Sequence, residues 1–161
     1  MPKRGQLGNV FIYVFAIVVI GLILMLGYNY ISKTRENIVK TDLLILKKEL
    51  TSDIESISSD FGSSKKSSYS VPNSAELCLF DLNKRGEILN NLPVNFNLLI
   101  KDSIASNVNK NAFVVSKSIF KSYYIGNIEI NEPYFKCLKP IRGKISFVVE
   151  GAGSKALILN E

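Results

Sequence analysis

The sequence has no histidine and no tryptophan, and it contains only two cysteines in 161 residues. Histidine is the commonest general base near neutral pH and the commonest metal ligand, so catalytic and metal sites that depend on it are excluded. No nucleophile elbow and no acidic pair at a motif spacing is present either. We therefore expect no enzyme, no metal and no cofactor. Four acidic residues are expected at the surface or in turns: Asp81, Glu87, Glu129 and Glu150.

A long run of basic residues is also missing, although the net charge is +6 and the pI is about 9.3. The basic residues occur singly or in pairs such as Lys47-Lys48 and Lys65-Lys66, and they alternate with acidic ones. Basic side chains close to a bilayer are attracted by anionic lipid without any nucleic acid. Membrane lipid is therefore the expected partner, and nucleic acid is not.

The sequence does have one long hydrophobic run, between Val10 and Gly27, without a charged side chain. At about 1.5 Å per residue this helix is roughly 27 Å long, close to the ~30 Å hydrocarbon thickness of a bilayer. It is longer than the core of a secretory signal peptide, and residues 28–31 contain no small-residue cleavage pattern. We predict a basic leader at 1–5 and a transmembrane helix at 6–30.

Residues 31–61 continue without proline, and their apolar side chains recur every three or four positions. This spacing forms one apolar stripe along a helix. We predict an amphipathic helix that continues the span, covers a sheet of its own domain and ends at Gly62. A parallel coiled-coil dimer is the alternative. The stripe consists of Leu43, Leu46, Leu50, Ile54, Ile57 and Phe61.

Residues 62–74 are polar and serine-rich, and we predict a mobile loop there. Short apolar runs follow over residues 75–161, which predicts a β-rich head with one weak helix at 96–104. The glycine-containing loop at 151–154 indicates a hairpin, because it lacks the spacing of a phosphate-binding loop and leads into a strand. Strands are expected at 75–82, 112–116, 118–130, 134–138, 144–150 and 155–159.

No helix long enough to cross between parallel strands separates these runs, so the predicted sheet is small and antiparallel. The fold class is therefore α+β: one long N-terminal helix packed on a β-sheet head, in a single-span membrane protein.

Cys78 and Cys137 both lie in apolar, strand-like stretches. Two free thiols would indicate the cytosol, whereas one disulfide, which we favour, indicates the exterior.

The start of the chain carries a family resemblance. Lys3-Arg4-Gly5-Gln6 followed by an uninterrupted hydrophobic helix resembles the archaeal type IV prepilins with class III signal peptides. The resemblance implies that a prepilin peptidase cleaves between Gly5 and Gln6. It also implies contacts with the pilus assembly machinery, a β-rich head, and homo- or hetero-oligomers formed through the N-terminal helix.

The mature family pattern is Gln-x-Ser-x-Glu-x-x-x-Leu. Gln6 matches it, whereas Gly8, Val10 and Val14 occupy the serine, glutamate and leucine positions. In the family the glutamate attracts the free amine of a neighbouring subunit, so Val10 favours a minor pilin over a major one. We expect a non-enzymatic structural subunit. The alternative is an anchored binding or sensor domain that does not polymerise.

Two signals disagree on which side of the membrane the head lies. The cations flanking the span slightly favour a cytoplasmic head by the positive-inside rule. The cysteines and the prepilin-like leader favour an exterior head, and long translocated domains follow the charge rule only loosely. We expect an exterior head and, if the subunit polymerises, an extracellular filament. The cations are Lys3 and Arg4 before the span, and Lys33, Arg35 and Lys40 after it.

Overall fold

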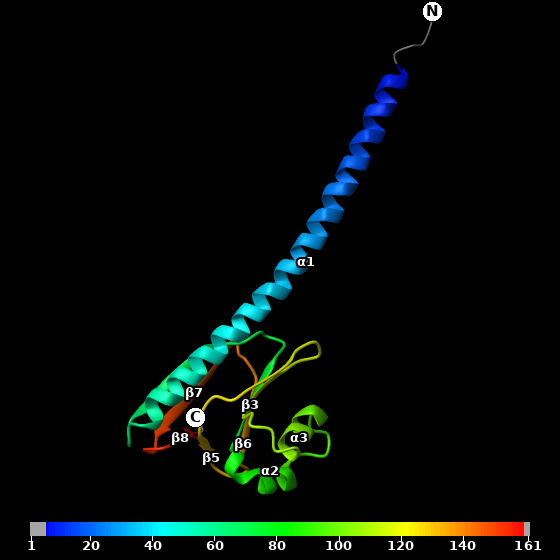
Figure 1. The fold of residues 1–161 in the computed structure, drawn as a ribbon. Helices are drawn as coiled ribbons and strands as arrows, with labels where there is room; N and C mark the ends of the chain where they lie inside the picture. Colours follow the sequence, from blue (N-terminus) through cyan, green and yellow to red (C-terminus); the bar gives the residue numbers. More distant parts are fainter. Residues whose placement is uncertain (1–5, 160–161) are drawn as a thin grey trace, which may run out of the picture. The chain divides into compact units, whose positions relative to one another are not determined.

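The computed structural model describes residues 6–159, except for the side chains of 6–10 and 32–37 (Figure 1). The predicted leader at 1–5 lies outside this range. The chain forms two compact units, one ending at Thr41 and one beginning at Asp42, so helix α1 (Gln6–Ser58) contributes to both. The other elements are β1 (Ser64–Ser70), β2 (Glu76–Phe80), a 3-10 helix η1 (Leu82–Lys84), α2 (Arg85–Asn91), α3 (Leu98–Ala105), β3 (Ala112–Val115), β4 (Phe120–Tyr123), β5 (Ile128–Ile130), β6 (Phe135–Leu138), β7 (Lys144–Gly151) and β8 (Ala156–Leu159).

In the first unit, the segment Phe11–Ile31 of α1 is long and apolar enough to cross a membrane. Its large apolar side chains are exposed within the described structure. Removing one such side chain from water contributes about 1.5–3 kcal/mol, so the segment as a whole requires a cover of lipid or protein. The structure therefore contains one candidate membrane span within residues 6–159, at the predicted position.

In the second unit, the amphipathic part of α1 packs on its own domain, as the apolar stripe predicts. Leu46, Leu50 and Ile54 are buried, and Figure 1 shows this part of the helix beside β7. The helix ends at Ser58 rather than at 61, because the chain turns there and the Asp60 N–H donates to the Ile57 carbonyl. The expected last stripe residue, Phe61, is 85% exposed.

The prediction of a loop at 62–74 is wrong, because β1 occupies most of it. All seven residues of β1 pair with β7 in antiparallel register, from Ser64 opposite Glu150 to Ser70 opposite Lys144. The strand was not predicted because its sequence contains few apolar residues. Its inward-facing residues Ser67 and Tyr69 form polar contacts with α1, so β1 needs few apolar side chains. As an edge strand, it also benefits from polar outward-facing residues.

The domain has two four-stranded sheets rather than one, with strand orders β1-β7-β8-β5 and β4-β3-β2-β6. The second sheet is antiparallel throughout, whereas in the first β5 pairs with β8 in parallel. Most strand pairs are antiparallel, as predicted, but the parallel β5–β8 pair was not expected, because a parallel crossover was assumed to need a helix. Here the chain crosses through β6 and β7 instead, over residues 131–155.

Helices α2 and α3 complete a second apolar core around the second sheet. Phe80 and Phe113 meet edge to face there, with ring centroids 5.4 Å apart, and Ile88, Ile100 and Ile104 pack against them. The predicted helix at 96–104 is confirmed as α3, and the Asn97 side chain caps it. Helix α2 lies between the predicted strand at 75–82 and the predicted helix at 96–104, where no element was expected.

Candidate functional site

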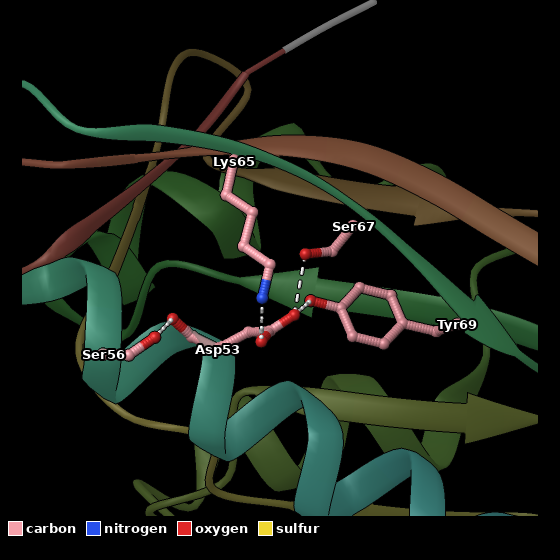
Figure 2. Close-up of polar contacts among 5 residues, drawn as sticks. All are labelled: Asp53, Ser56, Lys65, Ser67 and Tyr69. Carbon is pink, nitrogen blue, oxygen red and sulfur yellow. Dashed lines mark hydrogen bonds and ion pairs between the residues drawn. The ribbon is translucent and has the colours of Figure 1, made fainter.

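Asp53 receives three side-chain contacts from β1 (Figure 2). Its Oδ1 lies 2.7 Å from the Lys65 ammonium. Its Oδ2 accepts a hydrogen bond from the Ser67 hydroxyl at 2.7 Å and one from the Tyr69 hydroxyl at 2.9 Å. Residues 65, 67 and 69 alternate along the strand and therefore face the same side, toward α1. The cluster fastens the edge strand to the helix.

The ionisation of this cluster follows from its contacts. Burial by itself would raise the pKa of Asp53, but the three hydrogen bonds and the charge of Lys65 hold that pKa below its ordinary value. Burial also raises the pKa of the Tyr69 phenol, and the neighbouring carboxylate adds to the rise. At neutral pH the carboxylate is ionised and the phenol is neutral. Asp53 is therefore a structural acceptor rather than a poised base.

We expect that Asp53→Asn lowers the free energy of unfolding by about 2 kcal/mol, because the buried Tyr69 hydroxyl loses a charged acceptor. The Asp53 carboxylate has a lower pKa in the folded chain than in the unfolded chain, where it is about 3.9. Its contribution to stability is therefore complete above about pH 3.9 and is lost as the pH falls through the folded pKa. The difference between wild type and variant should therefore shrink on acidification. Chemical denaturation followed by near-UV circular dichroism measures it.

Glu55→Gln is the matched control, because Glu55 is an exposed acid on the same helix. Its neutralisation should change stability by less than about 0.5 kcal/mol at any pH. If Asp53→Asn behaves in the same way, the cluster does not stabilise the domain.

An open groove of about 640 Å³ lies beside the cluster, between α1 and β1. Its charged lining includes Lys48, Lys65 and Lys66 together with Glu49 and Asp53. Side chains of both signs therefore line it, and this mixture favours neither an anion nor a cation as a ligand.

The two cysteines stand opposite each other in the antiparallel β2–β6 pair and form a disulfide. Cys78 is buried in the second core, and Cys137 packs against it from the edge strand. The Glu76 carboxylate lies close enough to both sulfurs that the three could hold a metal ion. Disulfide-bonded sulfurs offer no thiolate, however, so in this oxidised form the group is not a metal centre.

The four acidic residues singled out in the sequence are used in local contacts or lie in strands. Asp81 is buried, and its carboxylate accepts the Asn83 N–H at 2.9 Å, which caps the 3-10 turn. Glu150 is half-buried in β7. The remaining two form ion pairs, Glu87 with Lys84 at 3.2 Å and Glu129 with Lys155 at 2.5 Å.

A small cleft of about 110 Å³ lies where the end of β2, the segment before β3 and the β4–β5 loop meet. The sequence did not predict this cleft, because its asparagines are spread along the chain and each one suits a turn. The repeated asparagines beside strand ends are the signal that could have found it. Its lining includes four asparagines and a tyrosine: Asn83, Asn109, Asn111, Asn127 and Tyr124.

The structure describes only one of the two residues at the predicted cleavage site. Gly5 lies outside the described residues, and Gln6 is the first residue of α1.

Comparisons with models of known protein families, with curated proteins and with solved structures find no significant match.

Proposed function

We propose that this protein is a non-enzymatic, membrane-anchored structural subunit of the type IV pilin kind, with its β-rich head outside the cell. The observation that carries the proposal is the exposed apolar segment Phe11–Ile31 of α1, preceded by the prepilin-like tetrad Lys3-Arg4-Gly5-Gln6. Such a helix needs an apolar cover, and the tetrad supplies a site at which its leader is removed.

Two kinds of cover satisfy the same helix. In a bilayer its backbone hydrogen bonds are all internal, as the hydrocarbon region requires. Neighbouring copies of an apolar helix provide an equally apolar surround, so the helix can exchange lipid for protein without exposing its backbone. A subunit that is first anchored and then assembled uses both covers in turn.

The disulfide supports an exterior head, because such bonds persist in oxidising surroundings and are rare in the cytosol. Val10, at the position of the assembly glutamate, supports a minor rather than a major subunit.

The experiment that tests the proposal is mass spectrometry of the intact protein from its native membrane. We expect a chain that begins at Gln6, since a prepilin peptidase removes residues 1–5. Gly5→Val should block the removal, because a branched side chain replaces the glycine at the cleaved bond. Gly8→Ala, three residues beyond the bond, is the control and should be processed normally.

A wild-type chain that starts at Met1 or Pro2 would count against the pilin-like proposal and favour an anchored sensor. Cross-linking in membranes separates the two functions further. A ladder of oligomers supports the structural subunit, whereas a single monomer band supports the sensor.

A further inference from the structure

The asparagine-lined cleft near β2, β3 and the β4–β5 loop has an uncharged lining, although 21% of the chain is charged. Three segments that are distant in sequence contribute to it, through Asn83, Asn109 and the loop from Tyr124 to Asn127. Amides and a phenol ring, without an ammonium or a carboxylate, do not select an ion. They match a neutral ligand with many hydroxyl groups.

The loop that carries Tyr124 and Asn127 is fixed by hydrogen bonds to a buried side chain. Asn111 is 1% exposed, and its side chain donates to the Gly126 carbonyl at 2.7 Å and accepts the Ile125 N–H at 3.0 Å. Gly126 has a φ of +107°, and a Cβ there would lie 2.9 Å from the Ile54 side chain. The loop is therefore preorganised, which lowers the entropy cost of binding.

The hydrogen-bond inventory of the cleft leaves two amides with capacity to bind. Asn127 is held in place, since it accepts from the Asn83 amide and donates to the Ser154 carbonyl, both at 3.3 Å. Among the described residues, no hydrogen bond is formed by the Asn83 Oδ1 or by the Asn109 side-chain amide, whereas the Asn83 NH₂ group is the donor to Asn127. Both side chains are exposed, and Tyr124 is 42% exposed beside them.

We propose that this cleft binds a neutral sugar, a hexose or a closely related polyol. The apolar face of the sugar ring lies on the Tyr124 ring, and its hydroxyls bond to Asn83 and Asn109. A hydroxyl both donates and accepts, and a side-chain amide offers both partners in one group. An aromatic ring supplies the apolar surface that the carbon face of a sugar needs.

The size of the cleft sets the extent of the ligand. At about 110 Å³, the cleft is well below the roughly 300–1,000 Å³ of a typical small-molecule pocket. One edge of a single ring fits this space, and the rest of the ring remains above the surface. The site therefore recognises a single residue, free or at the end of a chain. It does not depend on the proposed pilin role.

Saturation-transfer difference NMR on the full chain in lipid nanodiscs tests the proposal, with glucose, galactose, mannose and N-acetylglucosamine as probes. Nanodiscs avoid the sugar head groups of glycoside detergents. We expect saturable transfer from at least one sugar, with a dissociation constant in the millimolar range typical of few contacts. Asn109→Ala and Tyr124→Ala should each weaken binding at least about fivefold.

Asn95→Ala is the matched control, because Asn95 is exposed and lies outside the cleft, and it should bind like the wild type. Near-UV circular dichroism verifies the fold of each variant, and Asn109 is exposed enough to be changed without loss of packing. The proposal is overturned if no sugar gives saturable transfer above empty nanodiscs. It is also overturned if both cleft variants bind as well as wild type, or if phosphate competes for the site.

Discussion

Replacing Cys78 and Cys137 together by alanine should lower the free energy of unfolding of the second unit by about 4 kcal/mol. The bond joins residues 59 positions apart, and a loop of that length loses much conformational entropy when it is closed in the unfolded chain. Because domains of this size have a total stability of about 5–15 kcal/mol, the loss is a large fraction. Guanidinium denaturation, followed by near-UV circular dichroism, measures it.

The same experiment has an internal control in the reductant. A dithiol reductant should lower the stability of the wild type by a similar amount and leave the double variant unchanged, since the variant has no bond to break. A wild type that is equally stable with and without reductant would show that the second core holds β2 and β6 together without the bond.

The sequence predicted best those elements whose side chains follow one simple period. The apolar stripe of the helix has a spacing of three and four, and its residues from Leu43 to Ile57 are buried, as that spacing requires. The hairpin of β7 and β8 was predicted almost to its bounds, because β7 alternates regularly and glycines mark its turn. In both cases local sequence and tertiary packing favour the same structure.

The prediction failed where a strand depends on polar contacts with a distant element. β1 consists mostly of serine and lysine, and its inward-facing side chains are satisfied by Asp53 on the helix rather than by apolar packing. No pattern within residues 62–74 reveals that partner. The asparagine cleft was missed for the same reason, because three separate segments contribute to it.

The parallel pair of β5 with β8 shows a second kind of failure, one of topology. Local patterns predict strands, but they do not assign strands to sheets. The chain leaves the first sheet after β5, adds β6 to the second sheet, and returns as β7. The apolar side chains therefore pack on two sheets, where one sheet was predicted.

Gly151→Ala should destabilise the second unit by about 3 kcal/mol or more, at the upper end of what overpacking usually costs. A Cβ on Gly151 would overlap the backbone carbonyl oxygens of Ile57, in the last turn of α1, and of Asp60, in the turn that follows it. The strand cannot move aside, because the Gly151 N–H donates to the Ser63 carbonyl and its own carbonyl accepts the Gly62 N–H, both at 2.8 Å. Denaturation by guanidinium gives the loss in stability.

Gly86→Ala is the matched control, since the chemical change is the same and the outcome should have the opposite sign. Gly86 lies inside α2, and a Cβ there meets nothing within 4 Å. Alanine is preferred over glycine in a helix by about 1 kcal/mol, so this variant should be slightly more stable than the wild type. If Gly151→Ala were instead as stable as wild type, the backbone at the end of α1 would have to move away from β7 to make room for the Cβ. The close approach of helix and strand would then be a consequence of glycine and not a requirement of the fold.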